Sequence, residues 1–169
     1  MVLKHRKSNR LLNFDYSSSG YYFITICTKN RQEYFGNIIN NEMVINEIGK
    51  IVEAQWLWLE KQYKHVELDE FKIMPNHFHG IIIIKNKSNP VGTGLDLSLQ
   101  KKHLSLSNII GAFKTTSSIR IHKKGLKIFQ WQRSFYDHII RNEKSFYYIC
   151  QYIKNNSINW SEDRNNCKK

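Results

Sequence analysis

The apolar residues of this chain recur with the period of strands in some stretches and of helices in others, which indicates a mixed α+β fold. Strand-like runs rich in β-branched and aromatic residues cover residues 21–28, 43–45, 66–74, 77–84 and 129–140. Pro75 and Asn76 are a turn signal, so the strands on either side of them are expected to pair as a hairpin. The second run is expected to be a short edge strand, and the last run to form one strand or a pair.

Apolar residues at helical spacing predict three helices, over residues 47–63, 108–122 and 143–156. Each follows a residue whose side chain can cap a helix N-terminus: Asn46, Ser107 and Asn142. The inward positions expected in the second helix are Ile109, Ile110, Phe113 and Ile119, and Gly125 is expected to end it. The order β, α, β, β, α, β, α predicts a ferredoxin-like α+β sandwich, an antiparallel sheet with helices packed mainly on one face.

The sharpest local feature is a pair of histidines, His77 and His79, in the segment MPNHFHGI. On a strand they face the same way, while Phe78 between them points into the core. Two adjacent imidazoles can hold a divalent metal ion, and spacing alone leaves open the alternative of two surface histidines. A metal held by only two imidazoles keeps positions for a third, weaker ligand and for the oxygens of a bound phosphate.

The last predicted helix carries several tyrosines, one of which is a candidate nucleophile. Tyr152 and Asn156 are four residues apart and share a helical face, beside an apolar stripe of Ile149 and Ile153. A tyrosine in such a helix is more often a core or rim residue, and its hydroxyl is almost fully protonated at neutral pH. Its attack on a phosphodiester, however, conserves the bond energy in a phosphotyrosine ester, so a released 3′-hydroxyl can reverse the step.

Charge indicates the class of partner. Lys and Arg number 26 against 14 Asp and Glu, a net charge of +12. This charge favours a polyanion as partner, nucleic acid first and an anionic membrane second.

The three cysteines form no CxxC pair, which argues against a disulfide framework or a cysteine zinc site. No apolar run approaches the roughly 20 residues of a membrane span, and the N-terminus lacks the apolar stretch of a signal peptide. We therefore expect a cytoplasmic protein and no membrane partner.

Several motifs together resemble a known family. The triplet at 77–79 matches the HUH motif (His, hydrophobic, His) of single-tyrosine transposases. Residues 131–142 (WQRSFYDHIIRN), then Phe146 and residues 152–156 (YIKNN), resemble the C-terminal signature of the REP-associated tyrosine transposases, within the IS200-like transposase superfamily. The first predicted strand and the segment IIGAFK also lie where that family has its first strand and second helix. The resemblance covers about residues 20–160.

The resemblance implies a ferredoxin-like core, Mg²⁺ or Mn²⁺ as cofactor, and cleavage of single-stranded or hairpin DNA through a covalent 5′-phosphotyrosine intermediate. Transferred by position, His77 and His79 are metal ligands and Tyr152 is the nucleophile. Asn156 falls where the family has its third ligand. Asn155 remains an alternative, because the residue after Asn156 is not the proline that relatives often have.

On this reading the chain divides into a basic N-terminal arm (1–20), a catalytic domain (21–160) and a C-terminal tail (161–169). The basic side chains expected to bind DNA phosphates are Lys114, Arg120, Lys123, Lys124, Arg133 and Arg141, and residues 4–7 with Arg10 are a second candidate contact. Tyr136 can stack on unpaired bases, whereas Trp131 suits the core better. His138 either supports the active site or packs as a strand residue.

Two other functions remain open at this stage. The first is a non-catalytic nucleic-acid-binding module with a ferredoxin-like fold, although the aliphatic segment 80–84 lacks the aromatic pattern that such modules place on their central strands. The second is a domesticated relative that has kept DNA binding and lost mobility. The resemblance is compatible with either a monomer or a homodimer.

Overall fold

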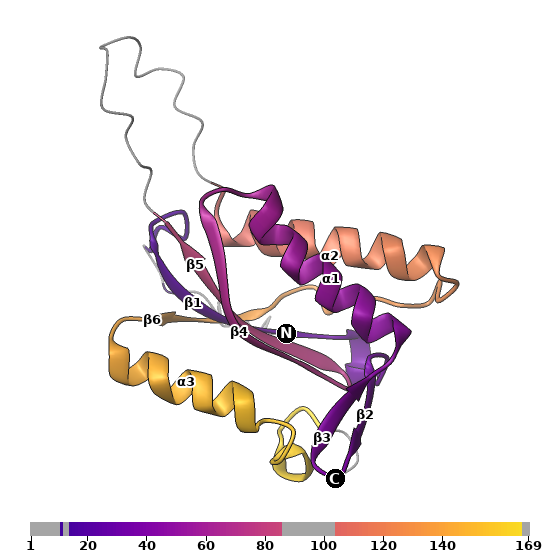
Figure 1. Cartoon of the computed structure of the whole chain (residues 1–169). Helices are drawn as coiled ribbons and strands as arrows, with labels where there is room; N and C mark the ends of the chain where they lie inside the picture. The colour runs from indigo at the N-terminus through magenta and orange to yellow at the C-terminus, as the bar shows by residue number, and fades with distance from the viewer. Residues whose placement is uncertain (1–10, 12–13, 86–103, 167–169) are drawn as a thin grey trace, which may run out of the picture.

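A four-stranded antiparallel sheet forms the centre of the computed structural model, which describes residues 11, 14–85 and 104–166 (Figure 1). Its strand order is β4-β5-β1-β6, and a separate pair, β2-β3, lies beside it. The strands are β1 (Gly20–Cys27), β2 (Gly36–Ile39), β3 (Glu42–Ile45), β4 (Val66–Met74), β5 (His77–Ile84) and β6 (Tyr136–Ile140). The helices are α1 (Glu47–Gln62), α2 (Leu106–Lys123) and α3 (Glu143–Asn155). The expected ferredoxin-like α+β sandwich is confirmed.

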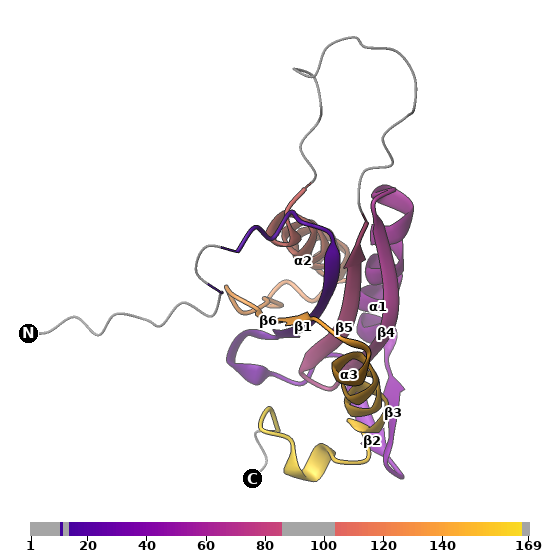
Figure 2. The same ribbon diagram turned by 90° about the vertical axis from the view of Figure 1, so that its left-hand side faces the viewer.

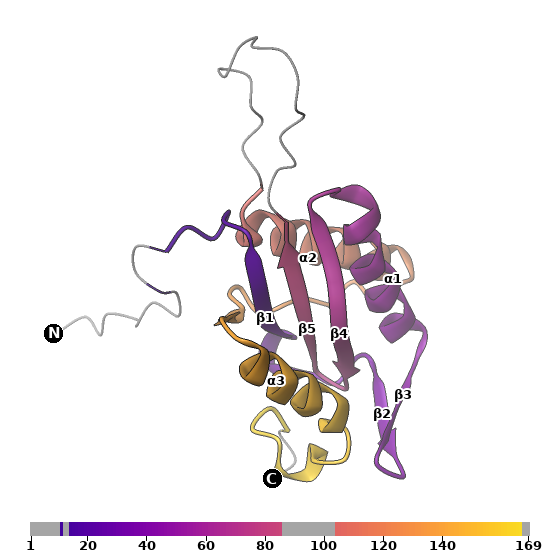
Figure 3. The same cartoon turned by 60° about the vertical axis from the view of Figure 1, so that its left-hand side comes forward.

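The sheet carries helices on both faces. In Figure 3, α3 crosses in front of the strands, and α1 and α2 lie behind them. The large core lies on the side of α1 and α2, where Trp56 of α1 packs 4.6 Å from the ring centre of Phe78 and 5.5 Å from that of Phe113 in α2. The helices are thus packed mainly on one face, as expected, and α3 covers the other. Within the described ranges, no helix has both the length and the apolar character needed to cross a membrane.

Helix boundaries follow the expected caps in two cases of three. The side chains of Asn46 and Asn142 accept backbone N–H bonds at the starts of α1 and α3, as expected. The second helix begins earlier than expected, because Ser105 rather than Ser107 accepts the N–H of Asn108. Ile119, expected inside, is 49% exposed, since the buried stripe consists of Leu106, Ile109, Ile110, Phe113, Ser117 and Ile121. Gly125, with a φ of 108°, follows the end of α2, as expected.

Two expected strands are revised. Residues 43–45 belong to the β2-β3 hairpin and are not an edge of the main sheet. The hairpin turns at Asn40 and Asn41, both of which have the positive φ that a type I′ two-residue turn requires. Within residues 129–140 only β6 is a strand, and Trp131 contributes a single bridge to Thr28 while its ring enters the core.

We expect Gly80→Ala to destabilise the fold, because a Cβ at this position would lie 2.6 Å from Trp56 Cζ2 and 2.8 Å from Phe78 Cε1. Overpacking of this kind costs about 1–3 kcal/mol. Gly111→Ala in α2 is the matched control: a Cβ there meets nothing within 4 Å, so helix propensity alone should stabilise the protein by about 1 kcal/mol. Urea unfolding of both variants measures the difference, and equal stability of the two would contradict the packing of Trp56 on β5.

Candidate metal and tyrosine site

The two histidines of β5 face each other on the side of the sheet that α3 covers. Their Nε2 atoms lie 2.9 Å apart, and both side chains are buried, which excludes the alternative of two surface histidines. His77 Nδ1–H donates to Asn76 Oδ1 at 2.8 Å, and His79 Nδ1 is hydrogen-bonded to Thr25 Oγ1 at 2.9 Å. Because Nδ1 of each ring is occupied, both Nε2 atoms are oriented toward one common point, as in metal sites whose ligands are fixed by outer partners.

Burial keeps both imidazoles uncharged. It lowers the pKa of His77 to about 4, although the nearby Asp163 carboxylate acts in the opposite direction. Burial and the neighbouring His77 likewise hold the pKa of His79 well below its ordinary value. At neutral pH both rings are therefore in the form that coordinates a metal ion.

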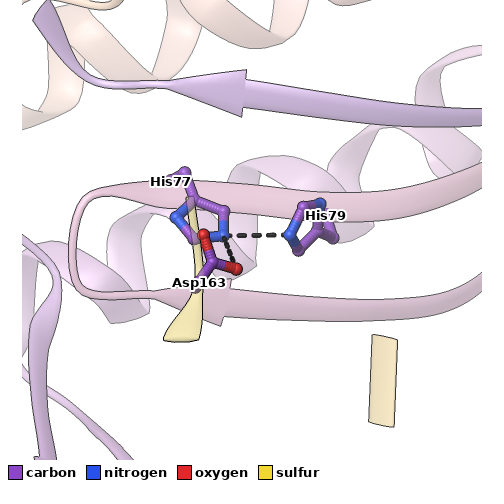
Figure 4. A group of neighbouring side chains, drawn as sticks. All are labelled: His77, His79 and Asp163. Carbon is purple, nitrogen blue, oxygen red and sulfur yellow. Dashed lines mark hydrogen bonds and ion pairs between the residues drawn. The ribbon is translucent and has the colours of Figure 1, made fainter. Parts of the chain in front are cut away.

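A carboxylate from the C-terminal end of the chain completes the group. Asp163 Oδ2 lies 4.0 Å from His77 Nε2, and the three candidate ligand atoms lie within 4.8 Å of one another (Figure 4). Two neutral imidazoles and one carboxylate are a donor set that divalent metal ions accept. The group can therefore bind a metal, although sequence analysis had not singled out Asp163.

Asn156, the expected third ligand, lies next to this carboxylate. Its side chain is buried, and its Nδ2 donates to Asp163 Oδ2 at 3.2 Å. Its Oδ1 is also buried and has no hydrogen-bond partner. A buried amide oxygen without a partner is costly, and a cation at the histidine pair would satisfy it. Asn155, the alternative, is exposed. The role of Asn156 as a ligand stays a prediction that fits this environment.

Tyr152 of α3 reaches the same place. Its hydroxyl lies 3.5 Å from His79 Nε2, and its ring packs edge-on against Phe23 at 6.0 Å. The residue is 43% exposed, so the side chain that contacts the buried His79 is also partly open to solvent. Burial, together with the charge of Asp163, raises its pKa. The other tyrosines of the helix, Tyr147 and Tyr148, are each 60% exposed.

Lys154 makes two polar contacts that tie the end of α3, which carries Tyr152, to β4. Its carbonyl accepts a hydrogen bond from Lys72 Nζ at 2.5 Å, and its own ammonium group pairs with Glu70 at 3.2 Å. Burial lowers the pKa of Lys72. Both contacts fix the last turn of the helix. They therefore also help to fix the position of Tyr152 relative to the two histidines.

The segment after α3, expected to be a tail from residue 161, is packed against the site. Figure 2 shows it folded back on the side of the sheet that α3 covers. The ring of Trp160 stacks on His77 at 5.9 Å, and Asn76 Nδ2 donates to the carbonyl of Asn165 at 2.8 Å. These contacts position Asp163.

The expected DNA-binding residues are spread over the molecule. Arg120 and Lys123 are exposed on α2, across the sheet from the histidines, and Lys124 lies 3.9 Å from Glu47. Lys114 donates to the carbonyls of Gln132 and Arg133, and burial lowers its pKa. All of these assignments remain predictions, as does the role of the exposed His138.

The other two expected DNA-binding residues, Arg141 and Arg133, lie elsewhere on the molecule. Arg141 is exposed at the end of β6. Arg133 borders an open cavity of about 660 Å³, whose lining residues are Lys29, Asn30, Arg31, Gln130, Trp131, Gln132, Arg133 and Ser134. The candidate residues 4–7 and Arg10 lie outside the described part of the chain.

The fold is similar to that of a solved transposase. A solved structure of a REP-associated tyrosine transposase bound to a REP hairpin superposes with a TM-score of 0.60 at 19% identity, over 94% of this chain and 77% of that one. No family model matches the sequence. An uncharacterized protein of Haemophilus influenzae is 43% identical over 176 residues, covering 96% of this chain and 93% of that protein. The chain belongs to the same family as that Haemophilus protein.

We expect the His-His-Asp group to bind Mn²⁺, and Asp163→Asn to weaken that binding. The variant keeps the size of the side chain but removes the charge, and even outer-sphere changes typically cost about 10–100-fold in metal affinity. Titration of the full chain with Mn²⁺, followed by calorimetry or by the Mn²⁺ paramagnetic resonance signal, measures the effect. Asp69→Asn, the same change at an exposed aspartate, serves as control. Unchanged affinity in Asp163→Asn, or equal losses in both variants, would exclude Asp163 as a ligand.

Proposed function

We propose that this chain is a metal-dependent single-tyrosine transposase of the HUH, REP-associated type, which cleaves and rejoins single-stranded or hairpin DNA. The observation that carries the proposal is the Tyr152 hydroxyl, 3.5 Å from Nε2 of the buried His79. A tyrosine and a histidine pair of this kind form a nucleophile beside a phosphate-binding centre. The shared fold with a transposase solved on a REP hairpin supports DNA as the substrate class, and so does the net charge of +12.

The reaction that fits this arrangement is a transesterification. Tyr152 Oη attacks the phosphorus of a phosphodiester, a bond from Oη to phosphorus forms, and the bond from phosphorus to the 3′ oxygen breaks. The hydroxyl proton passes to solvent, and the departing 3′ oxygen takes a proton from it. The products are a 5′-phosphotyrosine ester and a free 3′-hydroxyl end. Because the ester conserves the bond energy, another 3′-hydroxyl can reverse the step and join a new strand.

The chain's own groups prepare this site. His77 and His79 would hold Mg²⁺ or Mn²⁺ together with Asp163 and Asn156, and such an ion polarises a phosphoryl oxygen as a Lewis acid. Thr25 and Asn76 orient the two imidazoles through their Nδ1 atoms. Burial excludes water from the ligand side, whereas the partly exposed Tyr152 remains accessible to a DNA strand.

One copy of the chain contains all of these groups. The distance of 3.5 Å joins Tyr152 to a histidine of the same copy. We therefore propose that a monomer is sufficient for cleavage, and that a homodimer, if it forms, is not needed to complete the site.

A second candidate function is that of a non-catalytic or domesticated nucleic-acid-binding protein. The raised pKa of Tyr152, caused first by burial, favours it, because a hydroxyl held protonated is a weak nucleophile. The two functions differ in one product: both bind DNA, and only the transposase forms a covalent adduct.

We expect Tyr152→Phe to bind hairpin DNA as the wild type does but to form no adduct. The change removes only the attacking oxygen, and the loss of a nucleophile lowers the rate by at least about 10³-fold. The probe is a labelled pool of single-stranded oligonucleotides, each with a hairpin and randomised flanks, incubated with Mn²⁺ and analysed for SDS-stable adducts by gel and peptide mapping.

Tyr148→Phe, one turn earlier on the same helix, is the matched control and should keep the adduct. Loss of the adduct in the control and its persistence in Tyr152→Phe would move the nucleophile to Tyr148. Binding without any adduct in the wild type would favour the second function.

A further inference from the structure

Arg164, a cationic residue that the sequence analysis did not consider, lies near the candidate site. The guanidinium carbon of Arg164 is 5.6 Å from the centre of the Tyr136 ring, which is 41% exposed at the start of β6. That ring packs edge-on against Phe23 at 6.4 Å, and Phe23 in turn contacts both His79, at 5.5 Å, and Tyr152, at 6.0 Å. One layer of aromatic rings therefore connects the guanidinium to the tyrosine and the histidines.

The backbone that carries Arg164 is held on both sides while the residue itself is exposed. Its carbonyl accepts a hydrogen bond from the Arg31 guanidinium. The next residue, Asn165, donates its N–H to Asp163 Oδ1 at 2.5 Å and accepts at its carbonyl from Asn76. The backbone at Arg164 therefore needs no further ordering when the side chain binds a ligand.

Asp163 and Arg164 are the first two residues of a tight turn, in which the N–H of Asn166 donates to the Asp163 carbonyl at 3.0 Å. Asp163 has the extended values φ −60° and ψ 132° and directs its carboxylate at His77. Arg164, the next residue, directs its guanidinium at Tyr136 instead. A single short segment thus supplies an anion to the metal-binding side of the site and a cation to the tyrosine side.

The pKa shifts of the neighbouring groups are consistent with this position of Arg164. Burial is the main cause of the lowered pKa values of His77 and His79 and of the raised pKa of Tyr152. The positive charge of Arg164 acts on all three as well and lowers each pKa. The guanidinium is therefore close enough to influence both histidines and Tyr152.

We propose that Arg164 binds a non-bridging oxygen of the phosphodiester that Tyr152 attacks, and that it stabilises the charge developing there. The inference rests on the proposed function and adds a phosphate-contacting residue to it. A guanidinium forms a planar, two-pronged donor that matches phosphate geometry, and stacking on Tyr136 preorganises it. In the transesterification described above, negative charge spreads over the equatorial oxygens, where a fixed cation is most effective.

Binding of phosphate by Arg164 can be measured without cleavage. The probe is the dinucleotide TpT, a minimal phosphodiester, titrated into the ¹⁵N-labelled full chain, and the signal is the Nε–Hε resonance of Arg164, assigned by its loss in Arg164→Lys. We expect a saturable shift of this resonance, and no such shift with the uncharged methylphosphonate analogue of TpT. An unmoved Arg164 resonance, or equal shifts with both dinucleotides, overturns the inference.

Adduct formation tests the catalytic part. With the hairpin pool, Arg164→Gln should form the adduct on the order of 10²-fold more slowly than the wild type, and Arg164→Lys should lie between them. Guanidinium ions at millimolar concentration should restore part of the rate of Arg164→Ala, which a merely structural role would not allow. Lys61→Gln, the same loss of charge on the exposed side of α1, should leave the rate unchanged.

Two outcomes distinguish a failure of the role proposed for Arg164 from a failure of the proposed tyrosine mechanism. A wild-type rate in Arg164→Gln, or equal slowing in Lys61→Gln, refutes the role of Arg164 and leaves the tyrosine mechanism intact. Absence of any adduct in the wild type refutes the mechanism, and the TpT titration then decides whether Arg164 still binds phosphate.

Discussion

The antiparallel register between β1 and β5 determines where the chemistry of this molecule lies. It sets His79 opposite Thr25 and places Phe78 opposite Ile26 on the other face. Because side chains alternate along a strand, a slip of one residue would turn Phe78 toward α3 and both histidines into the large core. The packing of Phe78 on Trp56 therefore does more than stabilise the sheet, since it also fixes the direction in which the imidazoles point.

Burial keeps the two imidazoles in the metal-binding form, and it also makes the negative charge beside them energetically costly. Two imidazoles held neutral and in contact, beside a carboxylate whose side chain is 4% exposed, leave one negative charge in a nearly dry pocket. The amide of Asn156 and the nearby positive charges of Arg31 and Arg164 compensate part of this charge. A cation would balance this charge and would also satisfy the buried amide oxygen of Asn156, so these groups together favour cation binding.

Local patterns in the sequence were sufficient for β1, β4 and β5, two helix caps and the orientation of His77 and His79, because each depends on neighbours a few residues away. The start of α2 was misplaced because Ser105 and Ser107 are both good caps, and only the burial of Leu106 distinguishes them. Asp163 and Arg164 could not be predicted, since no spacing rule connects them to a histidine more than eighty positions earlier in the sequence. Their positions depend on long-range hydrogen bonds of the last described segment.

The helix that carries Tyr152 is the one least embedded in the molecule. α1 and α2 each bury several side chains, whereas α3 fully buries only Ile153 and otherwise rests on a small apolar cluster and the contacts at Lys154. Segments with few buried contacts open at a free energy well below that of global unfolding. A DNA strand joined covalently to Tyr152 would therefore be attached to a helix that can detach locally from the sheet while the sheet and its large core stay folded.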